Sequence, residues 1–79
     1  MDPKIAAFFA AGMAALGMGI AAAGTGLGVG LLSSKAMEGM ARQPEASGNI
    51  RTSMILAIAF VEAIALYMLV VCLLFVIKL

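Results

Sequence analysis

The sequence reads Gly24-Thr25-Gly26-Leu27-Gly28-Val29-Gly30 in the middle of an uncharged stretch, residues 5–34. In water such a run would argue against a helix, because glycine loses more backbone entropy on folding than any other residue. Inside a lipid bilayer the backbone cannot form hydrogen bonds with water. A helix is favoured there because it pairs its own N–H and C=O groups. A span needs about 20 apolar residues. The stretch therefore predicts a transmembrane helix over residues 5–34.

A second apolar stretch covers residues 52–77, and Glu62 is its only charged residue. This stretch is also long enough to cross a bilayer. The segment between the two, residues 35–51, is polar and contains Pro44. Because proline disfavours helical backbone at the residue before it, we expect a turn at Arg42-Gln43-Pro44-Glu45. The polar residues on either side of the turn are expected to continue the two helices into water.

The expected fold class is therefore an all-α membrane protein, a two-helix transmembrane hairpin that forms a single domain over residues 1–79. The composition agrees, since apolar residues make up 65% of the chain and charged residues 11%, against about 25% charge in soluble domains. The net charge of +1 provides no basic field for nucleic acid. The chain has no His and one Cys, Cys72, which excludes a disulfide framework and a Cys/His zinc site.

Lysine and arginine indicate the orientation of the hairpin. The polar segment contains Lys35, Arg42 and Arg51, whereas Lys4 and Lys78 lie near the two ends of the chain. Positive residues favour the cytoplasmic side. We therefore expect a multi-pass protein with its loop in the cytoplasm. We also expect its location to be a bacterial inner membrane.

Small residues in the first span form two stripes at helical spacing. One contains Ala10, Ala14, Gly17, Ala21, Gly24 and Gly28, and the other contains Gly12, Ala15, Gly19, Ala23, Gly26 and Gly30. Equivalent positions are about 200° apart around the helix. Small residues let helices approach closely in a membrane, and a head-to-tail contact between identical copies closes into a ring. The pattern favours a homo-oligomeric ring; the alternative is that the glycines pack on the second helix of the same chain.

Glu62 is the candidate ion carrier. A charge at the bilayer centre costs about 2.5–3.5 kcal/mol on insertion scales, and neither span contains Lys, Arg or His as a partner. The protonated acid is the cheaper state in lipid. The alternative is a structural carboxyl that only bonds a neighbour. With the turn between Gln43 and Pro44, Glu62 is expected at the depth of Thr25. Tyr67 either orients the carboxyl, across a boundary between copies, or is an interfacial aromatic.

These features together resemble the proteolipid, or c-type rotor subunit, of the F-type ATP synthase. The matching residues are the glycine run at 24–30, the loop Ala41-Arg42-Gln43-Pro44-Glu45, and the segment Phe60-Val61-Glu62-Ala63 with Tyr67. The resemblance implies a ring of identical copies in membrane lipid, with residues 5–34 inside and 52–77 outside. It also implies that Arg42, Gln43 and Pro44 face the central stalk of the catalytic head. Glu62 would exchange its ion with the a-type subunit of the stator, near an arginine of that protein, and ring rotation would drive ATP synthesis elsewhere.

The resemblance also bears on the transported ion. Sodium-carrying members of that family have Gln in the glycine run and Ser or Thr after the carboxylate, whereas this chain has Val29 and Ala63. This favours H⁺ over Na⁺, with the Phe60 carbonyl as one acceptor for the proton. Thr25 and Tyr67 remain as further oxygen donors near the site.

We expect no metal and no cofactor. We also expect no catalysis by the chain itself, because no nucleophile–base pair can be assembled without His and with a single carboxylate inside the spans. Two other classes of function compete with the rotor subunit. One is a holin-like two-helix pore, and the other is a subunit of a proton-coupled exporter. A stable, detergent-resistant ring distinguishes the rotor subunit from both.

Overall fold

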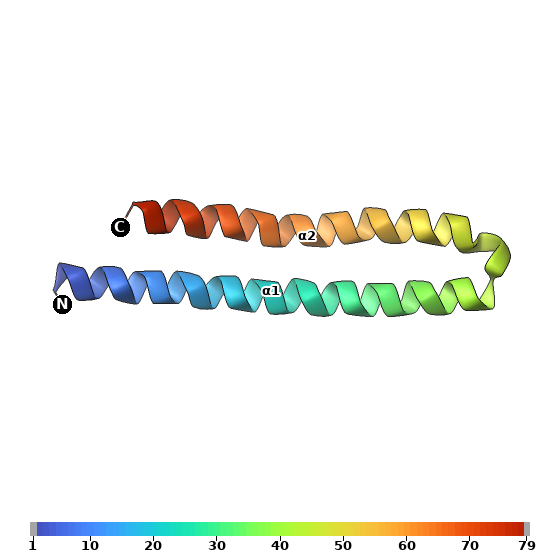
Figure 1. Ribbon diagram of the computed structural model, residues 1–79, viewed down its shortest axis with the longest axis horizontal. Coiled ribbons are helices and arrows are strands. Elements are labelled where there is room, and N and C mark those ends of the chain that lie inside the picture. The colour runs from blue at the N-terminus through green and yellow to red at the C-terminus, as the bar shows by residue number, and fades with distance from the viewer. Residues whose placement is uncertain (1, 79) are drawn as a thin grey trace.

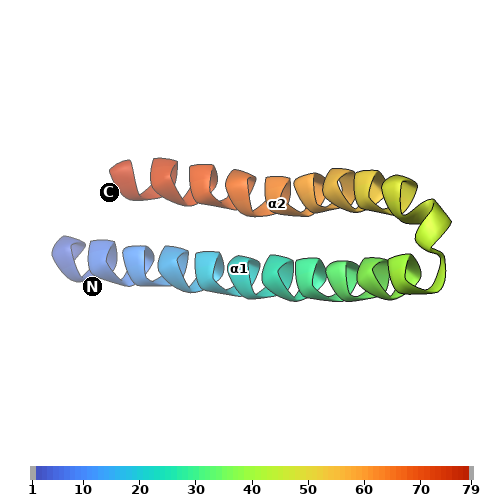
Figure 2. The same cartoon turned by 45° about the vertical axis from the view of Figure 1, so that its right-hand side comes forward.

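The structure, a computed structural model, describes residues 2–78. It consists of α1 (Pro3–Arg42), the short 3₁₀ turn η1 (Pro44–Ala46) and α2 (Ser47–Ile77). The two helices run antiparallel and lie side by side in both views, with the chain ends together and the turn at the far end (Figure 1 and Figure 2). The expected two-helix hairpin is confirmed, and residues 2–78 contain no strand.

Local sequence signals account for the limits of α1. Asp2 precedes the helix, and its Oδ1 accepts a hydrogen bond from the Lys4 backbone N–H at 3.2 Å, while Pro3 occupies the first helical position. At the other end the Gln43 N–H donates to the Gly39 carbonyl at 2.9 Å. Pro44 then stops the helix, because it disfavours helical backbone at Gln43. Only residues 43–46 of the polar segment leave α-helical geometry.

Small residues set the contact between the two helices. A Cβ atom added to Gly17 would lie 3.3 Å from Met68 Cε, and one added to Gly28 would lie 3.7 Å from Val61 Cγ1. Further toward the chain ends, the Cys72 Sγ donates to the Ala14 carbonyl at 3.4 Å. These pairs agree with the expected alignment, in which Glu62 and Thr25 lie at the same depth.

One hairpin buries very little of its apolar surface. Thr25 and Ala36 are the only residues in 2–78 that are buried, and most of the large apolar side chains of both helices are exposed. Both helices are long and apolar enough to cross a membrane. Their outer surfaces therefore suit lipid or identical copies rather than water.

The hairpin is longer than the hydrocarbon core of a bilayer. Its greatest extent is 63 Å, about twice the 30 Å thickness of that core. The polar segment, residues 35–51, lies at the turn end, where α1 and α2 both continue into it as helix.

Candidate functional site

The hairpin has two sides, which we name after the residues that distinguish them. The Glu62 side has two grooves that share Met18 and Leu69; one is also lined by Ala59, Glu62, Ala63, Ala65 and Leu66, and the other by Ala11, Ala14, Ala15, Cys72, Leu73 and Val76. The Tyr67 side has a groove lined by Phe9, Ala10, Met13, Ala14, Met68, Val71, Cys72 and Phe75. Tyr67 lies on this second side because it comes one helical turn before Val71.

Glu62 is an exposed carboxyl on the flank of α2. It lines a groove of about 470 Å³ whose other residues are all apolar. The ion pairs of residues 2–78 both lie in the polar segment, and neither involves Glu62. A single copy therefore supplies an open apolar groove beside the carboxyl but no cation to pair with it.

Thr25 lies at the depth of Glu62 but faces the interior of the hairpin. The residue is 8% exposed, and its Oγ1 donates to the Ala22 carbonyl of its own helix at 3.3 Å. Val29, one turn further along, is half-buried. Among the residues expected to support the proton site, Ala63 alone lines the Glu62 groove.

Phe60 and Tyr67 project away from Glu62. They are seven residues apart, which places them on one face of α2, and they are 68% and 73% exposed. Tyr67 is about 140° around the helix from Glu62. The structure therefore does not bring the Tyr67 hydroxyl to the carboxyl of the same copy.

Some glycines of α1 pack on α2, and others face away from it. Thr25 points toward α2, so Gly24 and Gly26 lie about 100° to either side of it, and a Cβ at either one would meet nothing within 4 Å. Gly17 and Gly28 pack on α2 of the same chain, as the alternative expects, whereas Gly24 of the same stripe does not. In the other stripe Gly12, Gly19, Gly26 and Gly30 are all open. Ala15 places this open stripe on the Glu62 side.

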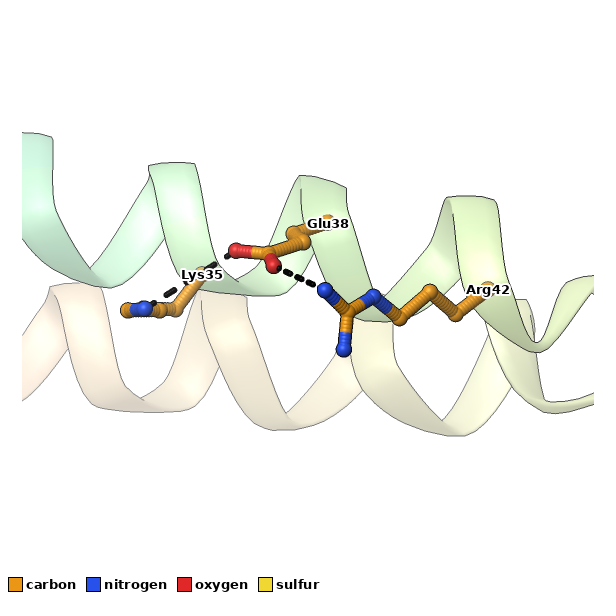
Figure 3. A network of polar contacts seen from close by, with 3 residues as sticks. All are labelled: Lys35, Glu38 and Arg42. Carbon is orange, nitrogen blue, oxygen red and sulfur yellow. Dashed lines mark hydrogen bonds and ion pairs between the residues drawn. The ribbon is translucent and has the colours of Figure 1, made fainter.

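The turn end presents exposed polar residues, among them Gln43 and Pro44. Arg42 Nη2 lies 2.8 Å from Glu38 Oε1, and Lys35 Nζ lies 3.8 Å from Glu38 Oε2 (Figure 3). Exposed pairs of this kind contribute about 0.3–0.5 kcal/mol. Arg42 can therefore exchange Glu38 for a carboxylate of another protein at little cost.

Sequence reasoning missed several residues of these sites. Met18, Leu66 and Leu69 line the groove beside Glu62, and Glu38 holds Arg42. Helical spacing could have identified Leu66 and Glu38, since each lies four positions from its partner. Met18 belongs to the other helix, and only the packing of the hairpin brings it to Glu62.

The chain is similar to known proteins over nearly its whole length. Residues 5–75 match the family model described as the C subunit of ATP synthase. A Clavibacter sepedonicus protein named as an ATP synthase c subunit is 53% identical over 66 residues, which cover 84% of this chain and 86% of that protein. A Clostridium botulinum protein of the same name is 49% identical over 81 residues, with 99% of each chain covered. A Euglena gracilis protein, named as the chloroplastic form, is 51% identical over 73 residues, which cover 92% of this chain and 89% of that protein.

Proposed function

The chain belongs to the ATP synthase C-subunit family, and from this premise we propose that Glu62 is the group that carries the transported ion. The chain is a membrane protein, a rotor ring subunit within the ATP synthase complex, and it is not itself catalytic. Membership of the family decides against the holin-like pore and the exporter component. The observation that supports the role of Glu62 is its position: it is the one charged residue of residues 52–77, and it is exposed in an apolar groove.

The proposed mechanism follows from the cost of charge in lipid. While Glu62 faces hydrocarbon it stays protonated, because a bare carboxylate there costs several kcal/mol. When rotation brings the residue to the a-type protein of the stator, an arginine of that protein and water stabilise the carboxylate, and the proton leaves. A proton from the other side of the membrane then neutralises Glu62 before it returns to lipid. Each exchange lets the ring advance by one copy.

In the proposed ring, α1 lies inside, α2 lies outside, and the Glu62 side of one copy packs on the Tyr67 side of the next. Such a head-to-tail contact closes into a ring when every copy repeats it. Gly24 and Gly26 flank Thr25 on the two sides of α1, and a Cβ added at either one would meet no atom of α2 within 4 Å. A Cβ-free surface on each flank allows the inner helices to approach closely. Gly30 extends this surface toward the turn.

We assign the transported ion as H⁺. A hard cation needs several oxygen ligands to replace its water, whereas the Glu62 groove is otherwise lined by Met, Ala and Leu side chains. The Thr25 hydroxyl is bonded to Ala22, and Val29 and Ala63 have no side-chain oxygen. The proton of a protonated carboxyl needs one hydrogen-bond acceptor, and the backbone carbonyl of Phe60 is a candidate. The hydroxyl of Tyr67 from the adjacent copy is a second candidate at the boundary between copies.

The turn end is the proposed contact with the central stalk of the catalytic head. Arg42, Gln43 and Pro44 are exposed at the far end of the hairpin from the chain termini (Figure 1). Lys35, Arg42 and Arg51 support the assignment of this end to the cytoplasmic side. We also propose that the membrane is a bacterial inner membrane, because a bacterial relative matches 99% of the chain.

The test of Glu62 is passive proton flow through vesicles from which the catalytic head has been removed. Glu62→Gln keeps the shape of the side chain but cannot release a proton, so flow is expected to fall to the background of protein-free vesicles while the ring still assembles. Glu45→Gln is the matched control, because Glu45 is an exposed carboxyl in η1, and it should leave flow unchanged. Proton flow that persists in assembled Glu62→Gln rings would exclude Glu62 as the carrier.

A further inference from the structure

The two grooves of the Glu62 side are continuous with each other. The groove beside Glu62 measures about 470 Å³, the groove nearer the chain ends measures about 250 Å³, and Met18 and Leu69 line both. Val76 lines the second groove 14 residues after Glu62, a distance of about 21 Å along a helix. Together the grooves lead from the carboxyl toward the chain-end side of the hairpin, opposite the turn (Figure 1).

Met18 of α1 and Leu69 of α2 lie at the junction of the two grooves. They are equally far from the turn, so they share one depth in the membrane, about two helical turns from Glu62. The rest of the α1 lining of the chain-end groove consists of small residues, Ala11, Ala14 and Ala15. Met18 is half-buried, and the flexible side chain of methionine fills irregular gaps. Met18 and Leu69 are therefore the side chains that can close the path between the two grooves.

An open path would expose Glu62 to water away from the stator. Apart from the Glu62 carboxyl, the side chains that line the two grooves carry no oxygen or nitrogen atom. In the proposed ring the Tyr67 side of the next copy covers both grooves, and a covered cavity with apolar walls stays dry. A carboxyl in a dry cavity keeps its proton, because no water solvates the charged form. Closure of the path therefore decides where Glu62 exchanges its proton.

We propose that Met18 and Leu69 form a seal between Glu62 and the water on the chain-end side of the membrane, so that Glu62 exchanges its proton only at the stator. The seal serves this purpose only if Glu62 carries the ion, so it rests on the proposed function. Met18 and Leu69 are positioning residues, and neither binds the proton. They exclude water from the carboxyl while the ring carries it through lipid, and a proton that left through an open path would contribute nothing to rotation.

The experiment measures how fast a charged, membrane-impermeant thiol reagent reaches the Glu62 groove. The rings carry Cys72→Ala and Ala65→Cys and lie in vesicles without the stator; Ala65 lines the Glu62 groove. Reagent added on the chain-end side is expected to react slowly while Met18 and Leu69 are present, because it needs a thiolate in water. Met18→Ser and Leu69→Ser should each speed the reaction about tenfold, because a hydroxyl lowers the cost of water beside it. Met18→Leu keeps the apolar volume and should keep the slow rate.

Leu16→Ser is the matched control for Leu69→Ser. Leu16 is exposed at nearly the depth of Met18 but lines neither groove, so its loss should leave the rate unchanged. Equal acceleration in Leu16→Ser and Leu69→Ser would mean a general loosening of the ring and would overturn the seal.

Reagent added on the turn side should react slowly in every variant, and acceleration from that side would also contradict a seal toward the chain ends. If Met18→Ser rings do not assemble, Met18→Gln, which keeps the length of the side chain, and Leu69→Ser decide, and an unchanged rate in both refutes the proposal. The thiol reaction involves no proton transfer. A seal that holds in rings whose Glu62→Gln variant still conducts protons would therefore refute the role of Glu62 and not the closed path.

Discussion

Glu62 and Tyr67 leave α2 on opposite sides of the hairpin, although only five residues separate them in the sequence. Glu62 lines the groove that includes Met18, and Tyr67 follows the face of Val71 on the other side. The two side chains leave α2 in directions about 140° apart around the helix axis. No change of rotamer therefore brings the Tyr67 hydroxyl to the Glu62 carboxyl of the same chain. The hydroxyl can therefore approach a carboxyl only in the neighbouring copy of a ring.

The first prediction concerns this boundary. In a background in which Cys72 is replaced by Ala, cysteines at positions 62 and 67 should be joined between copies by a short bifunctional maleimide. A denaturing gel should then show a ladder of multimers, because each link joins the Glu62 side of one chain to the Tyr67 side of the next. Leu66 lines the same groove as Glu62, so cysteines at positions 62 and 66 should give links within one chain only. Monomers alone from the 62 and 67 pair would rule out this boundary.

The second prediction concerns the open stripe of α1. Gly26→Leu places a large side chain where the inner helix of the next copy should lie, and overpacking of this kind costs about 1–3 kcal/mol at each contact. Because every boundary of the ring carries the same cost, the protein should run on a mild-detergent gel as small species. Leu27→Phe enlarges a side chain that is already exposed on the next position of the helix, and this variant should still form rings. Intact Gly26→Leu rings of normal size would show that the stripe lies elsewhere.

The hairpin itself could be predicted from the sequence, because few folds are compatible with such a sequence in a membrane. Two long uncharged stretches must form helices in lipid, and Pro44 stops the first helix at the residue before it. The depth of Glu62 followed from the position of the turn. These features depend on the lengths of the apolar stretches and on the backbone properties of proline, and both can be read from the sequence.

The use of each glycine stripe could not be predicted. Both stripes consist of Gly and Ala, so neither composition nor the period of 3.6 residues distinguishes the surface that meets α2 from the surface that meets another copy. Val61 and Met68 decide it by packing on Gly28 and Gly17. Thr25 was expected beside Glu62, but a shared depth does not fix direction around a helix, and its hydroxyl bonds the Ala22 carbonyl instead.

The third prediction concerns the turn. Arg42→Ala removes a guanidinium that can bond carboxylates in a planar fork, and a charged hydrogen bond of this kind contributes about 1.5–3 kcal/mol. Head binding to vesicles should weaken, and ATP hydrolysis should pump fewer protons, while passive proton flow persists. Glu38→Gln removes only the ion pair within α1 and leaves the guanidinium in place, so head binding should be retained. Unchanged head binding and coupling in Arg42→Ala would refute the docking role.

The fourth prediction concerns the identity of the ion. Carbodiimides react with a carboxyl in its protonated form, so labelling of Glu62 reports the bound proton. As pH rises the proton leaves, and labelling should fall. Added Na⁺ should not change labelling at fixed pH, because the groove supplies no side-chain oxygen besides the two of Glu62, and a hard cation needs several oxygen ligands.

A constructed sodium site provides the positive control. Val29→Gln together with Ala63→Ser introduces side-chain oxygens at the two positions where sodium-carrying relatives have them. In this double variant millimolar Na⁺ should protect Glu62 from the carbodiimide at fixed pH, whereas K⁺ at the same ionic strength should not. Protection of the unchanged chain by Na⁺ would contradict the proton assignment. The missing ligands would then have to come from the adjacent copy, where Tyr67 is the side-chain oxygen that the ring boundary brings toward Glu62.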